Sequence, residues 1–485
     1  MALAEVMAGI DVGTKLPDIA VAGLTHDSRQ VAAGFVFLAL PGLNADGMDF
    51  IPQAVALGAA AVVGGTKDIS GGATAPGPVP YIPVADPRAA YSRMAANFYG
   101  HPSRSMTTVG ITGTNGKTTT AALVAAILEA AGIPAATLGT LGVKWNGKTL
   151  HTGFTTPDAG LLHSLLADLK SAGRKGVVME MSSHALDQQR SADVELDVAL
   201  FTNLTPEHLD YHGSMAAYQE AKLRLFRQLA PAGTAIVNLD DAAAENFMAA
   251  APAKVLTYGL DPAADLQVTN FGLNLERTVA GLRFGEQSFA IESHLVGSYN
   301  LMNILGAVLA GLALDLPIDA IRQGIADVVT VPGRLERISS AAPGMVLIDY
   351  AHTPDAYSKV LGTLRDLTPA GTRLVLVFGC GGDRDRSKRP EMARIAERYA
   401  ERIIITSDNP RNEPLEQINA DILAGFSGQR HSVIPDRSAA LHTALGEMTP
   451  ETVLLILGKG RENYEWIGTE KVPHDDVAII ENYKA

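Results

Sequence analysis

A glycine-rich segment offers the clearest chemistry in the chain. Residues 110–118 read GITGTNGKT, with a lysine and a threonine directly after the last glycine. Glycines let backbone N–H groups turn toward a phosphate, the Lys117 ammonium adds positive charge, and the Thr118 hydroxyl can bind Mg²⁺. The common phosphate-loop spacing would place glycine at Ile111. Because a predicted strand precedes the segment and a predicted helix follows it, we predict a phosphate-binding loop rather than an ordinary turn.

Glu180, His208 and Lys222 form a second group with chemical potential. Glutamate and neutral histidine can hold a cation, which transfer of a phosphoryl group needs for charge neutralisation. Lysine as an ammonium cannot bind Mg²⁺, but a lysine carboxylated by CO₂ presents anionic oxygens. From the residues alone, Glu180 is equally a metal ligand or a salt-bridge partner. Alone, His208 favours a structural histidine and Lys222 a solvated helix lysine.

The third group is basic and lies near the C-terminus. Arginine can hold a carboxylate through two parallel hydrogen bonds, and Asp408 and Glu462 could hold an amine. A site that offers both signs of charge suits a zwitterionic amino acid, whereas an isolated charge run is usually a solvated surface. The basic residues are Arg384, Arg386, Lys388, Arg389 and Arg411.

Weaker signals lie elsewhere. Residues 25–29 and 42–47 could form two loops around a ligand, and ordinary turns explain them equally well. Arg334 and Asp349, with His352, could contact a nucleotide. Cys380 has no evident histidine partner, which favours an inert thiol.

Apolar strands and amphipathic helices must position these residues. Their alternation predicts parallel α/β sheets, in which ligands bind beyond the carboxyl ends of the strands. The polar and glycine-rich segments follow one predicted strand after another, as this rule expects. The predicted strands are 107–112, 175–181, 198–204, 234–240, 345–351, 373–379, 402–408 and 452–457, and the predicted helices are 118–132, 354–367 and 389–400.

Length and composition bound the class of protein. A chain of 485 residues with 47% hydrophobic and 19% charged residues predicts about three globular domains. We place them at 1–104, 105–332 and 333–485. A net charge of −13 argues against a general nucleic-acid binder. The single cysteine excludes an internal disulfide, and the lack of a basic leader or long apolar stretch favours a soluble, cytoplasmic protein, by default a monomer.

The motifs together resemble those of the Mur ligase family, ATP-dependent enzymes of peptidoglycan precursor synthesis. The resemblance covers nearly the whole chain, and the set is far more specific than any one motif. In the family's order, the chain reads GTNGKTTT, EMSSHALDQQR, FTNLTPEHLDYHG, YQEAKLRLF, LVGSYNLMN, PGRLE, DYAHTPD, GCGGDRDRSKRP, DNPRNEP and GKGRE.

The resemblance implies three α/β domains: a small N-terminal domain for a UDP-linked precursor, a central phosphate-loop ATPase domain, and a Rossmann-like C-terminal domain for an amino acid. The implied ATP residues are Gly113, Thr114, Asn115, Gly116, Lys117, Thr118, Thr119, Asn300, Arg334 and Asp349. The implied precursor residues are His26, Ser28, Leu43, Asn44, Ala45, Thr155, Thr156, Ser182, Gln188 and Arg190. The implied amino-acid residues are Arg384, Asp408, Asn409, Pro410, Arg411, Gly458 and Glu462. Lys117, Lys222, Glu180 and His208 would be catalytic, with Mg²⁺ held by Thr118, Glu180, His208 and carboxylated Lys222.

The resemblance also implies a reaction. DNPR is similar to the signature of members that add meso-diaminopimelate to UDP-N-acetylmuramoyl-L-alanyl-D-glutamate through an acyl phosphate. Alternatives are the same chemistry with L-lysine or a folate-like substrate, or a nucleotide-binding scaffold without ligase activity. Two residues depart from the family's pattern, since Arg461 stands where histidine is usual and Glu207 where aspartate is usual.

Overall fold

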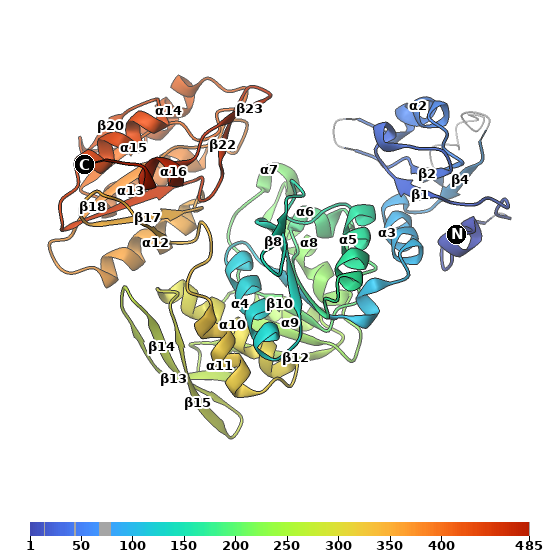
Figure 1. Cartoon of the computed structure of the whole chain (residues 1–485), viewed down its shortest axis with the longest axis horizontal. Coiled ribbons are helices and arrows are strands. Elements are labelled where there is room, and N and C mark those ends of the chain that lie inside the picture. The colour runs from blue at the N-terminus through green and yellow to red at the C-terminus, as the bar shows by residue number, and fades with distance from the viewer. Residues whose placement is uncertain (14, 43–44, 67–78, 485) are drawn as a thin grey trace.

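Three α/β bodies follow one another along the chain in the computed structural model. It describes residues 1–13, 15–42, 45–66 and 79–484. The N-terminal and C-terminal bodies lie on opposite sides of the central one (Figure 1). This architecture confirms the α/β class and the three units predicted from the sequence.

The N-terminal body is a four-stranded parallel sheet in the order β1-β2-β3-β4. Its strands are short, and buried aliphatic side chains from them pack against α3. The elements are β1 (Gly23–Thr25), β2 (Phe35–Leu38), β3 (Ala61–Gly65), β4 (Tyr81–Val84), α1 (Leu3–Val6), α2 (Ile51–Ala56) and α3 (Pro87–Phe98).

The central body contains an eleven-stranded sheet in the order β15-β14-β13-β12-β11-β10-β5-β9-β6-β7-β8. Its strands are β5 (Thr107–Thr112), β6 (Ala135–Gly139), β7 (Gly142–Trp145), β8 (Lys148–Leu150), β9 (Gly176–Glu180), β10 (Val198–Phe201), β11 (Thr234–Asn238), β12 (Lys254–Gly259), β13 (Leu266–Leu273), β14 (Thr278–Phe284) and β15 (Gln287–Ser293). Its helices are α4 (Lys117–Ala130), α5 (Ala159–Ser171), α6 (Ser183–Asp187), α7 (Leu209–His212), α8 (Met215–Arg227), α9 (Ala244–Ala250), α10 (Ser298–Ala313) and α11 (Ile318–Asp327).

The C-terminal body is a six-stranded sheet in the order β16-β17-β21-β18-β19-β20, with a separate hairpin of β22 and β23. Its strands are β16 (Glu336–Ile338), β17 (Met345–Asp349), β18 (Arg373–Phe378), β19 (Arg402–Ile405), β20 (His431–Val433), β21 (Thr452–Leu457), β22 (Tyr464–Ile467) and β23 (Glu470–Pro473). Its helices are α12 (Pro354–Leu367), α13 (Lys388–Tyr399), α14 (Leu415–Leu423), α15 (Arg437–Gly446) and α16 (Asp476–Glu481).

The strands at the middle of both large sheets are parallel, as predicted. The edges of the central sheet are not: β13, β14 and β15 pair antiparallel, and so do β6, β7 and β8. The sequence analysis did not predict these edges. Along β14 and β15 buried side chains alternate with more exposed ones, and along β8 all side chains are exposed. These strands therefore lack the continuous apolar run that marks a strand buried on both faces.

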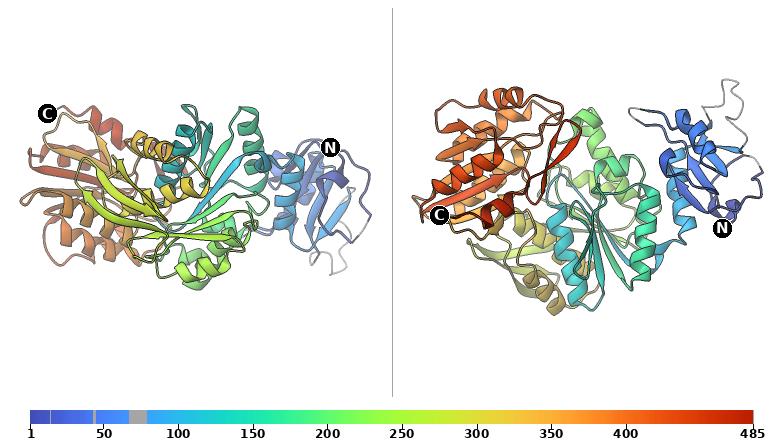
Figure 2. Two further views of the ribbon diagram at one scale, coloured as in Figure 1. Left: turned by 90° about the horizontal axis from the view of Figure 1, so that it is seen from below. Right: turned by 45° about the horizontal axis from the view of Figure 1, so that its top comes forward.

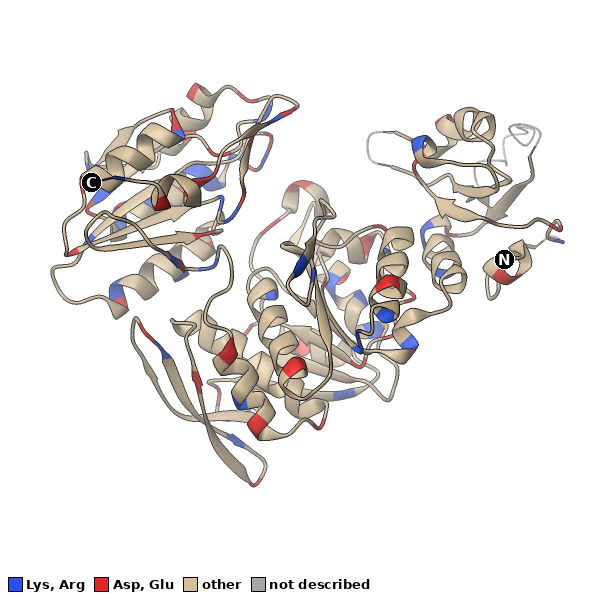
Figure 3. Ribbon diagram, viewed as in Figure 1, with Lys and Arg blue, Asp and Glu red and all other residues tan. Residues whose placement is uncertain are grey.

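Helices cover both faces of the two large sheets (Figure 2). One face of the central sheet packs against α4, α10 and α11, and the other against α5, α8 and α9. None of the described helices, including the strongly apolar α10, has the length and hydropathy needed to cross a membrane. Acidic and basic residues are interspersed on each body in the view of Figure 3.

An aromatic stack anchors α9 to the central sheet. The Phe247 ring lies 3.7 Å from that of Phe201 on β10 and 5.1 Å from that of Phe226 on α8. All three side chains are buried. Because rings of this size bury much apolar area, the stack contributes substantially to the central body.

We therefore expect Phe247→Ala to lower the stability of the protein by about 3–5 kcal/mol, since it leaves a cavity between two rings. Calorimetry should show the unfolding transition of the central body shifted down by roughly 10 °C. Phe271→Ala is the matched control, because Phe271 lies on β13 and is exposed. Equal shifts for the two variants would contradict the role of the stack.

Candidate active site

The glycine-rich loop connects β5 to α4 and needs glycine at two positions. Gly113 has φ of +145°, and a Cβ there would lie 1.9 Å from Thr202 Oγ1. Gly116 has φ of +88°, and a Cβ there would lie 2.3 Å from Asn303 Oδ1. A side chain at Gly113 would clash with Thr202 after β10, and one at Gly116 would clash with Asn303 on α10, so the predicted loop depends on both glycines.

Two lysines converge on one carbonyl group of this loop. Lys117 Nζ donates to Gly113 O at 2.8 Å and to Thr114 O at 2.7 Å, and Lys222 Nζ donates to the same Gly113 O at 2.8 Å. Burial, reinforced by the Lys117 charge, holds the pKa of Lys222 well below its usual range. Burial also lowers the pKa of Lys117. Burial of Lys222 therefore favours its neutral amine more than exposure to water would.

Glu180 ends β9 directly beside the loop, and its side chain is 3% exposed. Its Oε2 accepts hydrogen bonds from Thr118 Oγ1 at 2.9 Å and Thr140 Oγ1 at 3.2 Å. Its Oε1 accepts one from the Thr140 backbone N–H at 3.0 Å. The carboxylate is thus held in one orientation beside the first turn of α4.

His208 lies at the start of α7 with φ of +55°. Its ring packs edge-on against that of His184, with centroids 4.7 Å apart, and burial lowers its pKa. In the described parts of the chain, no three His, Cys, Asp or Glu side chains form a metal site by themselves. The predicted Mg²⁺ set differs in kind, because it adds the Thr118 hydroxyl and a Lys222 carboxylate. The lowered pKa of Lys222, which favours the neutral amine, fits that addition.

Polar contacts join the C-terminal body to the loop and to the segment after β10. Asn115 Nδ2 donates to Asp355 Oδ2 at 2.9 Å, and Arg334 Nη2 donates to Thr118 Oγ1 at 3.2 Å. His352 Nε2 lies 3.3 Å from Glu207 Oε1, so the glutamate at this position reaches across the interface. The sequence analysis had assigned no role to Asp355 or Glu207.

A cavity of about 250 Å³ lies between the loop and the C-terminal body. Six of the predicted ATP residues line it: Asn115, Gly116, Thr118, Thr119, Arg334 and Asp349. Asn300 is not a lining residue but contacts one, since its Oδ1 accepts a hydrogen bond from Asn303 Nδ2 at 3.1 Å. Asn303 and Tyr350 also line the cavity and were not predicted. Asn303 belongs to the motif LVGSYNLMN and Tyr350 to the motif DYAHTPD, and these motifs are the signal in the sequence that could have identified them.

A second cavity, of about 400 Å³, lies between the N-terminal and central bodies. The predicted precursor residues that line it are His26, Ala45, Gln188 and Arg190. Residues Arg88, Tyr91, Phe154 and Asp158 also line it and were not predicted.

The other predicted precursor residues lie close to these walls. Arg190 Nη1 donates to Thr156 O at 2.8 Å, and Thr156 Oγ1 accepts from the Ser182 backbone N–H at 3.1 Å. Thr155 Oγ1 lies 3.2 Å from Thr140 Oγ1, beside Glu180. Ser28 is buried and donates to Gln53 Oε1 at 2.8 Å. The predicted residues Leu43 and Asn44 lie outside the described residues.

Of the amino-acid residues predicted in the C-terminal body, Arg384 lies beyond β18 and the others lie beyond β19 and β21. Asn409 Nδ2 donates to Glu462 Oε2 at 2.9 Å, and Tyr350 Oη donates to Glu462 Oε1 at 3.2 Å. A Cβ at Gly458 would lie 2.2 Å from Asp408 Oδ2, so glycine is required beside this carboxylate. The Pro410 carbonyl packs closely on Gly382 of the neighbouring loop.

The basic residues predicted as one group divide into two by their partners. Arg389 is fully buried and pairs with Glu413 and Asp421, and Arg386 pairs with Asp421. Burial and the nearby Arg384 charge lower the pKa of Arg411. Arg384 and Arg411 therefore form a pair of like charges, distinct from the arginines that are already neutralised.

Arg461, the departure from the family's pattern, has a structural partner. Its Nη2 lies 2.5 Å and its Nε 3.0 Å from the two carboxylate oxygens of Glu336. Glu336 is 4% exposed and also accepts from the Gly333 backbone N–H at 2.7 Å. Arg461 thus fastens the loop after β21 to the segment that enters the C-terminal body.

A phosphate loop on a central parallel sheet, with an α/β body and a ligand-sized cavity on either side, defines a multidomain α/β enzyme. Three family models match its successive parts: "Mur ligase family, catalytic domain" over residues 20–99, "Mur ligase middle domain" over 111–311 and "Mur ligase, glutamate ligase domain" over 333–460. The chain belongs to the Mur ligase family.

Relatives extend the likeness over nearly the full length. A UDP-N-acetylmuramoyl-L-alanyl-D-glutamate–2,6-diaminopimelate ligase of Geobacter sulfurreducens is 44% identical, with 94% of this chain and 92% of that protein covered. The ligase of that name from Geobacillus kaustophilus is 40% identical, with 96% and 94% covered.

Solved structures agree with this. A structure of a ligase of the same name is 33% identical, covers 99% of this chain and 98% of its own, and superposes with a TM-score of 0.70. A Mycobacterium tuberculosis folylpolyglutamate synthase shares the fold at 22% identity with a TM-score of 0.65, over 76% of this chain and 92% of its own.

Replacing Arg461 tests the contact with Glu336. We expect Arg461→Ala to destabilise the protein by about 1–3 kcal/mol, because the buried Glu336 carboxylate loses its charged partner. Thermal unfolding measures the change, and Arg337→Ala is the control, since Arg337 is exposed on β16 next to Glu336. A stability of Arg461→Ala equal to that of the control would show that the pair contributes nothing.

Proposed function

We propose that the protein is an ATP-dependent amide ligase that joins meso-diaminopimelate to UDP-N-acetylmuramoyl-L-alanyl-D-glutamate. The similar ligases named above support the reaction, and the pair Arg384 and Arg411 carries the choice of amino acid. These two arginines have no carboxylate ion-pair partner among the residues that the structure describes, and Arg411 lies near the acidic Asp408 and Glu462, which suits a ligand that has both carboxylates and amines.

The reaction needs activation, because a carboxylate is a poor acylating agent. Transfer of the γ-phosphoryl group of ATP to the D-glutamyl side-chain carboxylate would give an acyl phosphate and ADP. The amine of diaminopimelate would then attack the acyl carbon, phosphate would leave, and the amine would lose a proton. Lys117, once released from its loop carbonyls, would face the transferred phosphoryl group and stabilise its charge.

Mg²⁺ would be held by Thr118, Glu180, His208 and carboxylated Lys222, and when bound it neutralises phosphate charge. Carboxylation of Lys222 needs a neutral amine to attack CO₂ with loss of one proton. The buried site and the neighbouring Lys117 charge both favour that neutral form. The product is an anion, which would also relieve the repulsion between the two lysines at Gly113 O.

The two cavities support separate places for the other substrates. The one between the N-terminal and central bodies would hold the UDP-linked precursor, with its peptide end directed past Arg190 and Thr156 toward Glu180. The contacts of the C-terminal body with Asn115 and Thr118 would exclude water, which otherwise hydrolyses an acyl phosphate. We infer a cytoplasmic enzyme that acts as a monomer and binds no nucleic acid.

The alternatives differ in what they leave unexplained. L-lysine lacks the distal carboxylate, so it would leave an arginine unpaired in a closed site, which carries a large penalty. A folate-like substrate would leave the first body without a ligand. A nucleotide-binding scaffold without ligase activity would not explain why the Lys222 amine is buried beside the phosphate loop.

Phosphate release with a panel of amino acids tests the function. We expect release with meso-diaminopimelate in the presence of ATP and the UDP-dipeptide precursor, and little with L-lysine. Arg411→Ala should raise the KM for diaminopimelate about 10–100-fold, because it removes a charge-assisted hydrogen bond, and should leave the KM for ATP nearly unchanged. Arg386→Ala is the control, since Arg386 already pairs with Asp421. Equal effects of Arg411→Ala on both KM values would contradict the assignment.

The mass of the native protein tests Lys222. We expect a mass higher by one CO₂, lost in Lys222→Ala, with activity reduced by about two orders of magnitude. A short-chain carboxylic acid should restore part of that activity by supplying the missing anionic oxygens. Lys170→Ala, on the exposed side of α5, should change neither activity nor the CO₂ adduct. A fully active protein without the adduct would refute carboxylation.

A further inference from the structure

The arginine pair stands on two separate loops. Arg384 follows β18 and Arg411 follows β19, and each is held by a carbonyl of the first loop: Arg384 Nη1 donates to Asp383 O at 3.0 Å and Arg411 Nη1 to Gly382 O at 2.9 Å. For residues 1–484 as far as they are described, no carboxylate lies within 4.0 Å of either guanidinium as an ion-pair partner. The separation of the two charges therefore depends on how the two loops are joined.

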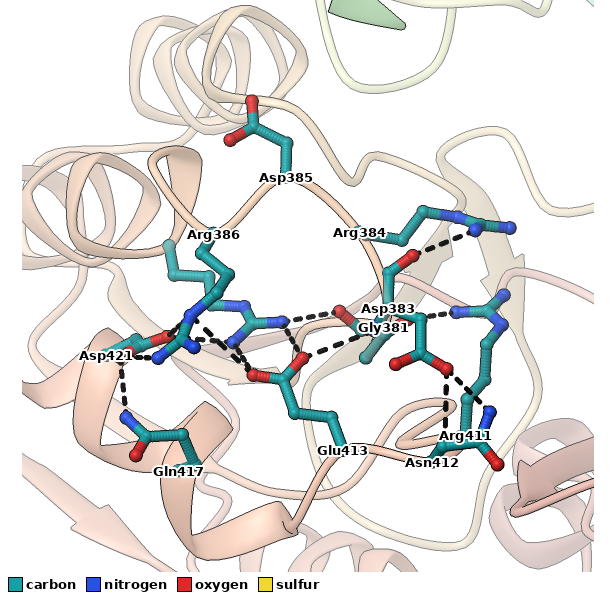
Figure 4. Close-up of polar contacts among 12 residues, drawn as sticks. Gly381, Asp383, Arg384, Asp385, Arg386, Arg411, Asn412, Glu413, Gln417 and Asp421 are labelled. Carbon is teal, nitrogen blue, oxygen red and sulfur yellow. Dashed lines mark hydrogen bonds and ion pairs between the residues drawn. The ribbon is translucent and has the colours of Figure 1, made fainter. Parts of the chain in front are cut away.

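One exposed carboxylate joins them. Asp383 Oδ2 accepts hydrogen bonds from the Asn412 backbone N–H at 3.2 Å and from Asn412 Nδ2 at 2.9 Å (Figure 4). Asp383 directly precedes Arg384, and Asn412 directly follows Arg411. This contact, which we name the loop clasp, therefore links the two arginines through their immediate neighbours.

Both sides of the loop clasp have a residue in the left-handed backbone region, which aspartate tolerates better than arginine. Asp383 has φ of +53° and Arg411 has φ of +52°. The left-handed region is disfavoured for arginine, so surrounding contacts must hold it there. The Arg411 backbone N–H donates to Trp466 O at 2.9 Å, and the Gly468 N–H donates to Arg411 O at 2.8 Å. A residue held in this way is typical of a site whose geometry matters.

A buried arginine supports the loop clasp from below. Arg389 Nη1 and Nη2 donate to the two carboxylate oxygens of Glu413 at 2.7 Å each, and Nη2 also donates to Gly381 O at 3.1 Å. Glu413 Oε2 in turn accepts from the Asp383 backbone N–H at 3.2 Å. Removing Arg389 or Glu413 would leave a charge buried without a partner and would endanger folding, so neither is a clean probe.

We propose that Asp383 is a specificity-determining positioning residue, which sets the spacing of Arg384 and Arg411 through the loop clasp and so favours an amino acid with a second, distal carboxylate. This rests on the proposed function. Asp383 itself need not touch the substrate, because its carboxylate is used by Asn412.

The physical reason lies in the difference between two substrates. A dicarboxylic diamino acid has a carboxylate for each arginine, so loss of their spacing weakens a hydrogen-bonded, charged contact. L-lysine has only one carboxylate and depends less on that spacing. Loosening the loop clasp should therefore reduce discrimination between them rather than lower all binding equally.

Asp383→Ala and Asp385→Ala make a matched pair of variants. Both remove one exposed carboxylate from the same loop, on either side of Arg384. The Asp385 side chain points away from the loop clasp (Figure 4). It accepts hydrogen bonds from the nearby Ser387 N–H at 2.9 Å and from Ser387 Oγ at 2.6 Å. Asp383→Asn is a third variant, since asparagine tolerates the left-handed region and retains one acceptor.

Steady-state phosphate release is measured for each variant with diaminopimelate and with L-lysine. For Asp383→Ala we expect the KM for diaminopimelate to rise about 10-fold with kcat and the KM for ATP nearly unchanged, so the preference over lysine falls about 10-fold. Asp383→Asn should recover most of that preference, and Asp385→Ala should behave as the wild type.

Several results would overturn the inference. They are an unchanged KM for diaminopimelate in Asp383→Ala, an equal loss in Asp385→Ala, or a parallel loss for ATP and both amino acids. Failure of the proposed function looks different, since the wild type itself would then not prefer diaminopimelate. If the wild type prefers diaminopimelate and the Asp383→Ala variant prefers it equally, the role of the loop clasp is refuted and the proposed function stands.

Discussion

The chemistry depends on one constraint: the carboxyl ends of two parallel sheets must face each other across a single interface. Asn115 with Asp355, and Arg334 with Thr118, fix that interface at the phosphate loop. Neither half is sufficient, because the loop follows β5 and the proposed amino-acid residues lie beyond β18, β19 and β21. A reactive acyl group formed at the loop could meet an amine only if the C-terminal body brings it there.

Basic side chains placed close together are the second feature of the site. Lys117 and Lys222 donate to one carbonyl oxygen, and Arg384 and Arg411, from two loops, donate to carbonyl oxygens of the adjacent residues Asp383 and Gly382. Repulsion of this kind lowers stability unless an anion joins the pair. In the proposed function, phosphate, the Lys222 carboxylate and a substrate carboxylate would be those anions, so the positive charge of the free protein would favour binding of its ligands.

Much of this could be predicted from the sequence, because the informative signals are local. The strand at 107–112, the helix at 354–367 and the loop between Gly113 and Thr118 depend on spacing within a few residues, and the structure has them at those positions. Polar segments after apolar strands also predicted which edge of each sheet would carry the site.

What could not be predicted depends on partners far away in the chain. Arg386 and Arg389 look like Arg384 in the sequence, and only Asp421 and Glu413, which follow another strand, show that they are already neutralised. In the sequence, Glu207 is only a conservative departure from the family's pattern. Its contact with His352 of the C-terminal body is visible only in the structure. The antiparallel edge strands lacked a continuous apolar run, and Tyr350 had no signal that its hydroxyl would reach Glu462.

The most direct test of the account follows one oxygen atom. The D-glutamyl side-chain carboxylate of the UDP-linked precursor is labelled with heavy oxygen, and the phosphate released with ATP and meso-diaminopimelate is analysed by mass spectrometry. If the loop and the amino-acid site act across one interface on an acyl phosphate, each phosphate carries one labelled oxygen. If the labelled precursor instead gave phosphate without heavy oxygen, released at the same rate, the account would be contradicted.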